Sequence, residues 1–445
     1  MNKHSASKPI LLVLYPYPVS EFLYNLMELD YFLTYCDVVV WDISMLTNFK
    51  FASAQTYARA SRSNIVSIST WTQFFRIVAD LKELSLTHAL TIRTFPRTKN
   101  AAEFLVATHL YFSFRKSAIK LFDMINPGLP LLTTSPANGS LHKIPSTALI
   151  ARFRAFTQHI SSLQELNSRI ADSIFRTLAR TYSGALTHRI VAGQHYLPEA
   201  VRRRKQGSTL IFGHSDDYSA YLRNSVHYIE KTPDRPKIAV LLDAAGPAFT
   251  DDSLQQDRAP SCTAAVWYPA LAKFFDRLEA ATGVSVEIAG HYKSTHPPIA
   301  ACFGNRAVHY GRTLELVRDC EFVITRDSMA VSYAVVFQKP VIFIYSDEIV
   351  ADRFSMQWPL HMASWLGTIP VNIDSPPTNF TSLLHVNETK YKAYETACLT
   401  SANTSRPNYQ IILEDIMGIT TIPGPDAARN LPPANYSASE HTSNN

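Results

Sequence analysis

The sequence predicts an α/β protein made of two Rossmann-like domains with a ligand crevice between them. The chain has 445 residues, 46% of them hydrophobic, which is enough for two cores because single domains usually contain about 100–200 residues. Apolar runs typical of buried strands alternate with helical patterns, as in domains with a mainly parallel sheet. The alternation stops at the breaker cluster KTPDRP (residues 231–236) and then starts again, so we place a domain boundary there.

The first domain is expected to cover residues 1–232. It opens with the continuous apolar run ILLVLY (residues 10–15), which ends in Pro16-Tyr17-Pro18, as a central parallel strand entering a loop would. Further strands are predicted at residues 37–41, 64–68, 88–92, 189–192 and 209–213. Helical patterns are found at residues 20–34, 72–84 and 101–114.

A longer helical pattern with a basic face occupies residues 145–180. Five arginines lie among its apolar residues, and a basic amphipathic helix can lie on an anionic membrane surface. The simpler interpretation, which we prefer, is a helix packed on its own domain with a solvated basic face. Peripheral contact with a membrane therefore remains an alternative.

The second domain is expected to cover residues 233–422. Its strands are predicted at residues 237–243, 284–289, 321–325 and 341–345, and a helix is predicted at residues 268–282. Residues 423–445 are polar and rich in proline, which predicts a disordered tail.

Composition excludes several classes of protein. The net charge is only +5 and the basic residues are scattered apart from residues 202–205, which argues against nucleic-acid binding. The five cysteines form no CxxC pair, so neither a disulfide framework nor a structural zinc site is expected. The sequence has no apolar run of the roughly 20 residues needed to span a bilayer and no signal-peptide pattern, so we expect a cytoplasmic protein.

Polar residues follow three strand ends of the second domain. Ligands of open parallel sheets bind outside the carboxyl ends of the strands, where helix N-termini and cationic side chains bind phosphate. For Ser328 a helix cap, and for His291 a surface loop position, are the simpler interpretations. The candidate residues are His291, Lys293 and Ser294, then Gly311, Arg312 and Thr313, then Arg326, Asp327 and Ser328, with Ser332 one turn further along.

Acidic residues give weaker signals. Asp347 and Glu348 follow the strand at residues 341–345 and are positioned either to accept hydrogen bonds from sugar hydroxyls or to complement the dipole of the next helix. The pairs at residues 216–217 and 251–252 resemble paired carboxylates for a metal, but adjacent acids are common in loops. We therefore predict no metal site and no cofactor.

Two long segments carry a family resemblance: KFFDRLEAATGVSVEIAGHYKS (residues 273–294) and GRTLELVRDCEFVITRDSMAVSYAVVFQKPVIFIYSDE (residues 311–348). They resemble bacterial surface-polysaccharide biosynthesis proteins, which make capsule or lipopolysaccharide O-antigen and have a GT-B-type glycosyltransferase fold. The end of the VLLD run at residue 243 and, more loosely, residues 23–44 share this resemblance. The resemblance implies that a sugar is transferred from a nucleotide donor, bound in the second domain, to a glycan or lipid-linked acceptor held by the first.

The sequence differs from this family at His291. Related proteins have His-Pro where this chain has His291-Tyr292, and in sialyltransferase-like members a His-Pro motif and a Ser-Ser/Thr motif contact the CMP phosphate. Here His296-Pro297 is a displaced alternative, and Ser328 or Ser332 would supply the hydroxyl. The donor nucleotide therefore stays open between CMP and UDP.

Sugar transfer requires a base for the acceptor hydroxyl and stabilisation of the leaving phosphate. The resemblance implies a metal-independent reaction with the base in the first domain, where Glu21 and Asp42 each follow a predicted strand. Either acid would equally serve as a helix-cap or loop residue. Three other activities fit the same fold: a nucleotide-sugar epimerase, a polyol-phosphate transferase, and a noncatalytic scaffold of polysaccharide assembly.

Overall fold

The computed structural model of the protein describes ten segments of the chain. They are residues 7–47, 59–94, 101–114, 117–125, 186–198, 208–224, 236–244, 246–247, 260–291 and 302–421. The helical pattern expected at residues 145–180 and the tail expected at residues 423–445 lie outside the described residues.

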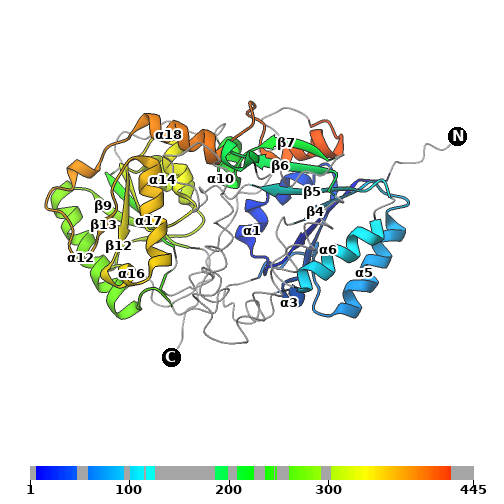
Figure 1. Ribbon diagram of the computed structural model, residues 1–445, viewed down its shortest axis with the longest axis horizontal. Coiled ribbons are helices and arrows are strands. Elements are labelled where there is room, and N and C mark those ends of the chain that lie inside the picture. Colours follow the sequence, from blue (N-terminus) through cyan, green and yellow to red (C-terminus); the bar gives the residue numbers. More distant parts are fainter. Residues whose placement is uncertain are drawn as a thin grey trace, which may run out of the picture.

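The first domain is built on a seven-stranded parallel sheet (Figure 1), in the order β3-β2-β1-β4-β5-β6-β7. β1 is a continuous apolar run (ILLVLY) because both of its faces are buried. The strands are β1 (Ile10–Tyr15), β2 (Asp37–Asp42), β3 (Ile65–Ser67), β4 (Leu90–Thr94), β5 (Lys120–Ile125), β6 (His188–Ala192) and β7 (Thr209–Gly213).

Helices cover both faces of the first sheet. α5 (Trp71–Leu84) and α6 (Ala101–Phe114) share one hydrophobic cluster with the sheet, while α1 (Glu21–Leu26) and α2 (Leu29–Phe32) share the other. One helix was expected over residues 20–34, but Glu28 has a left-handed backbone (φ 62°) that separates α1 from α2. The shorter elements of this domain are α3 (Ser44–Thr47), the 3-10 turn η2 (Gln194–Tyr196) and α10 (Asp216–Asn224).

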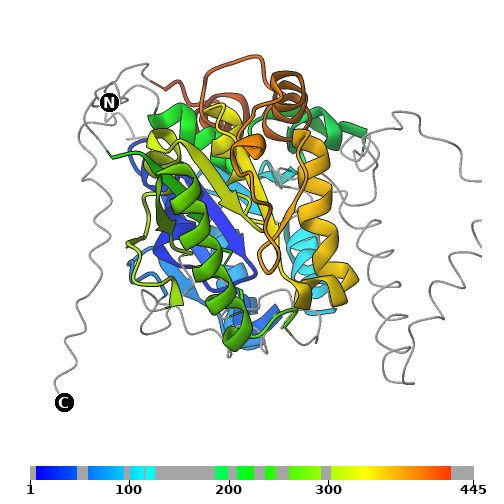
Figure 2. The same ribbon diagram turned by 90° about the vertical axis from the view of Figure 1, so that its left-hand side faces the viewer.

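The second domain has a six-stranded parallel sheet in the order β10-β9-β8-β11-β12-β13. The strands are β8 (Ile238–Leu242), β9 (Ser285–Ala289), β10 (Val308–His309), β11 (Phe322–Thr325), β12 (Val341–Tyr345) and β13 (Val371–Asn372). α12 (Ala264–Thr282) and α17 (Arg353–Leu366) lie on opposite sides of this sheet in Figure 2. The remaining helices are α14 (Thr313–Asp319), α15 (Val331–Val336), α16 (Asp347–Ala351), α18 (Glu388–Tyr394) and the turns η4 (Thr381–Leu383) and η5 (Glu395–Leu399).

Apart from the additional edge strand β7 of the first sheet, the two sheets have the same strand order, and each has one point at which the order reverses. That switch point lies between β1 and β4 in the first sheet and between β8 and β11 in the second. Ligands of doubly wound sheets bind outside the carboxyl ends of the strands at such a point. The fold is therefore α/β with two Rossmann-like domains, as the sequence predicts, and it marks one edge in each domain for a ligand.

Residues 408–417 return to the first domain. α19 (Asn408–Ile411) and the π-helical turn η6 (Ile412–Met417) place Ile411, Leu413 and Ile416 in the hydrophobic cluster under the first sheet. The domain boundary near residue 233 stays a prediction. The structure adds that residues 408–417, which follow this boundary, pack on the first domain. None of the helices in the described part of the chain is both long and apolar enough to cross a membrane.

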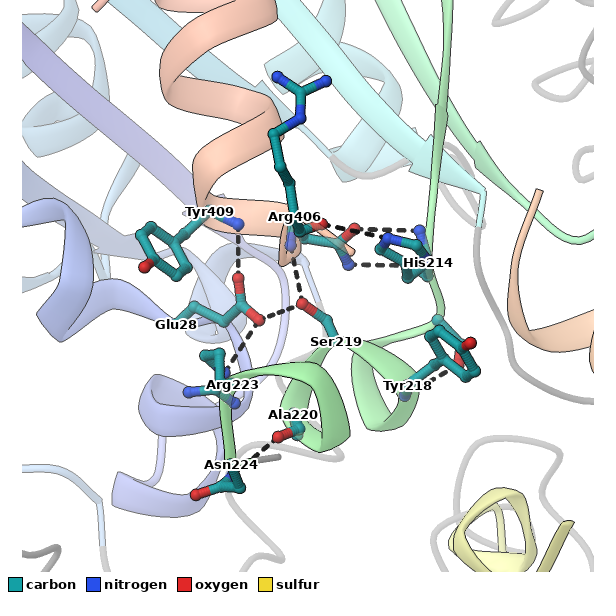
Figure 3. Close-up of polar contacts among 11 residues, drawn as sticks. Glu28, His214, Tyr218, Ser219, Ala220, Arg223, Asn224, Arg406 and Tyr409 are labelled. Carbon is teal, nitrogen blue, oxygen red and sulfur yellow. Dashed lines mark hydrogen bonds and ion pairs between the residues drawn. The ribbon is translucent and has the colours of Figure 1, made fainter. Parts of the chain in front are cut away.

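A buried polar network ties three distant segments of the first domain together (Figure 3). The Glu28 carboxylate is ion-paired with Arg223 on α10 (3.1 Å) and accepts hydrogen bonds from the Ser219 hydroxyl and from the Tyr409 N–H (2.6 Å). His214, just before α10, contacts the carbonyl oxygen of Arg406 through Nε2 (3.1 Å). These contacts hold α10 between the α1–α2 turn and α19, although the buried Arg223 Nε, which lies within ion-pair distance of Glu28, makes no hydrogen bond of good geometry.

Candidate functional site

The switch point of the second sheet brings a carboxylate and a guanidinium together. Leu242 and Thr325 are register partners on β8 and β11, so Asp243 and Arg326 follow at adjacent strand ends. Burial lowers the pKa of the Arg326 guanidinium, but the carboxylates of Asp327 and Asp243 more than offset this, so its pKa lies above its ordinary value. Arg326 is therefore a fixed positive charge at the edge where the fold places a ligand.

Arg326 is held on three sides. Its Nε donates a hydrogen bond to Asp327 Oδ1 (3.0 Å), and its guanidinium lies 5.9 Å from the centroid of the Trp267 ring. On the third side is Gly246, where an added Cβ would come within 2.6 Å of Nη1. Without a side chain, Gly246 lets the loop after β8 approach the guanidinium closely, and a larger residue there would require the guanidinium to shift.

His291 and two tyrosines complete what we call the strand-end cluster, which consists of Asp243, Tyr268, His291, Tyr310 and Arg326. The His291 N–H donates to Asp243 Oδ2 (3.3 Å). Burial and then the Asp243 carboxylate raise the pKa of both tyrosine hydroxyls. Both phenols therefore keep their protons at neutral pH and remain hydrogen-bond donors beside Asp243.

The turn after β10 lies next to this cluster in the sheet order. Gly311 has a left-handed backbone (φ 70°), Arg312 is the exposed N-cap residue of α14, and Thr313 begins the helix. The structure thus brings the sequence candidates at residues 311–313 to a strand end beside that of His291, because β10 pairs with β9. Lys293, Ser294 and the His296-Pro297 pair lie outside the described residues.

The two serine candidates have different surroundings. The Ser328 hydroxyl accepts a long hydrogen bond from the Ala330 N–H (3.4 Å), in keeping with a local cap. Ser332 is fully buried, and its Oγ lies 2.6 Å from both Asp217 Oδ2 and the Met329 carbonyl oxygen. Ser332 therefore connects α15 with α10 of the first domain and is engaged away from the strand-end cluster.

The acids at the start of α16 also have partners. Asp347 Oδ1 accepts a hydrogen bond from the Asn372 side chain (2.7 Å). Glu348 accepts hydrogen bonds from the N–H and hydroxyl of Thr263 (2.9 and 3.0 Å) and so caps α12, whose N-cap residue makes no side-chain cap of its own. Burial raises the pKa of the Cys262 thiol, the Arg326 charge lowers it, and the Glu348 charge raises it. Because Cys262 is close enough to both charges to be affected by them, Glu348 lies near the strand-end cluster. A contact of either acid with a donor sugar stays a prediction.

The two acids proposed as bases lie at the carboxyl edge of the first sheet, and each is paired with an arginine. Glu21 is bound by Arg62 (2.8 Å) with 45% of its side chain exposed. Asp42 is 2% exposed and accepts hydrogen bonds from Arg59 (3.2 Å) and from the backbone N–H of Ser44 (3.0 Å). Their assignment as bases stays a prediction.

Asp243, Tyr310 and Gly246 were not among the sequence candidates. Asp243 carried a usable signal, because an acid directly after the central strand of a doubly wound domain lies at the switch point. Tyr310 and Gly246 carried none, since their roles depend on contacts across the fold. Within the described part of the chain, no group of three His, Cys, Asp or Glu side chains is arranged to hold a metal ion.

No protein-family model matches this sequence, and no curated protein matches it. Among solved structures, the wall teichoic acid polymerase TagF, as a His-to-Asn variant soaked with CDPG, is similar with a TM-score of 0.50 and 13% identity over 92% of this chain and 90% of that one. MnaA of S. aureus with UDP gives a TM-score of 0.46 at 10% identity over 93% and 98% of the two chains. UDP-GlcNAc 2-epimerase of Methanocaldococcus jannaschii with UDP-GlcNAc and UDP gives 0.38 at 9% identity over 86% and 98%. At such identities the similarity to TagF shows the fold alone, which is of the GT-B type.

Proposed function

We propose that the protein is a metal-independent glycosyltransferase. In this proposal it moves a sugar from a nucleotide-sugar donor to a polysaccharide or lipid-linked acceptor in bacterial surface-glycan biosynthesis. The observation that carries the proposal is Arg326 at the switch point of the second sheet, where its largely buried guanidinium is paired with Asp327 and lies near the Asp243 carboxylate at the adjacent strand end. We place the protein in the cytoplasm, with peripheral contact to the inner membrane as an alternative.

The donor phosphates bind at the strand-end cluster in this proposal. As the glycosidic bond breaks, negative charge develops on the phosphate of the leaving nucleotide. Arg326 and Arg312 stabilise that charge, and a guanidinium matches the geometry of phosphate oxygens through paired N–H donors. His291 and Ser328 contribute further donors from neighbouring strand ends.

The acceptor hydroxyl loses its proton to a base in the first domain. Glu21 is the more accessible candidate, because 45% of its side chain is exposed whereas Asp42 is 2% exposed. For either acid to accept a proton, its arginine partner has to move aside when the acceptor binds. Comparing the Glu21→Gln and Asp42→Asn variants in single-turnover assays separates the two.

A thermal-shift screen against CMP, UDP, GDP and their sugars tests the donor site. We expect one nucleotide to raise the melting temperature, because a ligand at 100 times its dissociation constant stabilises a protein by about 2.7 kcal/mol. Arg326→Ala should abolish this protection. Arg277→Ala is the matched control, because Arg277 is an exposed residue of α12 and should leave the protection unchanged. The same protection in the Arg326 variant would overturn the donor site.

Product analysis separates the remaining activities. An epimerase converts a nucleotide sugar without any acceptor, and a transferase releases the nucleotide only when an acceptor is present. A polyol-phosphate transferase, the activity closest in kind to the TagF similarity, would consume a CDP-polyol and release CMP. A scaffold would bind no nucleotide in the thermal-shift screen.

A further inference from the structure

Arg93 is a buried arginine without a partner in the first sheet. It is the fourth residue of β4 and is 6% exposed, and no group in the described part of the chain forms a hydrogen bond or ion pair with it. Its register partners are Val13 on β1 and Phe122 on β5, which are both fully buried and have no polar side-chain atoms. A guanidinium keeps its proton in proteins and has five N–H donors, so Arg93 is a buried cation with unused hydrogen-bonding capacity.

The carboxylates on neighbouring strands are already taken by other arginines. Asp123 on β5 receives two hydrogen bonds from Arg189 on β6, both 2.8 Å long. Asp42 on β2 is bound by Arg59 and by Ser44. Because these two acid–arginine pairs balance their own charges, neither carboxylate is left as a counter-charge for Arg93 within the described part of the chain. No nitrogen of Arg93 is among the fully buried atoms that lack a hydrogen-bond partner, so the guanidinium is accessible to an anion although the residue as a whole is only 6% exposed.

The position of Arg93 is the one at which the fold places ligands. β1 and β4 form the switch point of the first sheet, and Arg93 is one residue from the carboxyl end of β4. Strand side chains lean along the strand direction, and the long arginine side chain reaches further than its neighbours. An anion that enters this edge therefore meets a guanidinium whose donors are unoccupied.

We infer that Arg93 is an anion-binding residue of the first domain and that it holds a phosphate group of the acceptor. The identity of the anion as part of an acceptor rests on the proposed glycosyl transfer, whereas the anion site itself does not. Arginine binds phosphate through two parallel N–H···O bonds, which fits a phosphomonoester or a pyrophosphate. The donor phosphates and the acceptor phosphate would then be held by different domains, at Arg326 and Arg93.

The test is a titration of the full-length protein with inorganic pyrophosphate and, separately, with glycerol phosphate, followed by melting temperature. We expect a saturable rise in the wild type and in the Arg326→Ala variant, and its loss in Arg93→Gln. Arg93→Lys keeps the charge but not the paired donors, so its midpoint should shift at least tenfold to higher concentration. Arg277→Gln should behave as the wild type. A stronger response to pyrophosphate indicates a diphosphate-linked acceptor, and a stronger response to glycerol phosphate indicates a polyol-phosphate chain end.

Equal responses in the wild type and Arg93→Gln, or no response in the wild type, would overturn the inference. Arg93→Met adds a second readout: without added anion it should melt at a higher temperature than the wild type, because it removes an uncompensated buried charge. A lower melting temperature would show that Arg93 is a structural residue. Nucleotide protection should persist in Arg93→Gln, so absence of nucleotide binding in every variant would count against the donor site and not against Arg93.

Discussion

Glu28 shows how one residue couples local backbone strain to long-range packing. Its left-handed backbone ends α1, and its buried carboxylate is shared by Arg223, Ser219 and the Tyr409 N–H. Left-handed backbone at a residue other than glycine is unfavourable and persists only when surrounding contacts determine it. Those contacts come from segments about 190 and 380 residues away along the chain, which is why the sequence predicts one helix where the structure has two.

Replacing Glu28 with alanine should destabilise the protein by about 3–5 kcal/mol, because it leaves the buried Arg223 charge without a partner. Urea unfolding followed by circular dichroism measures this. The double variant Glu28→Ala/Arg223→Met removes both charges and should recover most of the loss. A loss below about 1 kcal/mol in the single variant would mean that the carboxylate contributes no more than a surface pair does.

The candidate site was predictable at this scale only in part. Residues at strand ends, such as Arg326 and His291, are visible in the sequence because a strand end follows from the apolar run before it. The direction in which the Ser332 side chain points is not visible in the sequence, because the rotation of α15 about its own axis is set by packing against Asp217 on α10. Asp243 and Arg326 become neighbours through strand order, which no local pattern encodes.

At the scale of elements, the contact between α10 and α15 links the two domains through a carboxyl group with an altered pKa. Burial raises the pKa of Asp217 to about 6, and the Asp216 charge adds to this, while hydrogen bonds from Ser332 and Tyr333 act in the opposite direction. The folded protein therefore binds this proton more tightly than the unfolded chain. As the pH rises from about 4 to about 6, Asp217 loses this proton, and the free energy of unfolding falls.

The Asp217→Asn variant should remove this pH dependence. The Asn oxygen still accepts a hydrogen bond from Ser332, so below pH 4 the variant and the wild type should be equally stable. Above pH 6 the variant should be more stable by about 3 kcal/mol, since each pKa unit corresponds to about 1.4 kcal/mol. Chemical unfolding between pH 4 and pH 7 measures the difference, with Asp216→Asn as the control that keeps the titrating group. Parallel curves for Asp217→Asn and the wild type would refute the assignment.

Element boundaries followed the sequence closely where strands are apolar throughout. β1 and β12 begin and end at the predicted residues. β5 was not predicted, because its sequence KLFDMI contains a lysine and an aspartate, and the buried Asp123 is paired with Arg189 on the next strand. A buried ion pair between strands 66 residues apart leaves no local signal.

At the scale of the whole molecule, the two-domain α/β fold followed from composition and from the restart of the strand–helix alternation. The strand order of the two sheets and the return of residues 408–417 to the first domain did not, because both depend on pairings between distant segments. The shared strand order makes the two switch points equivalent. One carries Arg326 with its carboxylate partners, and the other carries Arg93, which has no carboxylate partner among the described residues.

The central claim is that a donor nucleotide binds at the carboxyl edge of the second sheet. Hydrogen exchange measured by mass spectrometry, with and without the nucleotide found by the thermal-shift screen, tests this most directly. We expect slower exchange in peptides that contain Asp243–Pro247, Gly290–His291 and Arg326–Ser328, and no such slowing in the Arg326→Ala variant. Slower exchange confined to the strand ends of the first sheet, around Asp42 and Thr94, would contradict it.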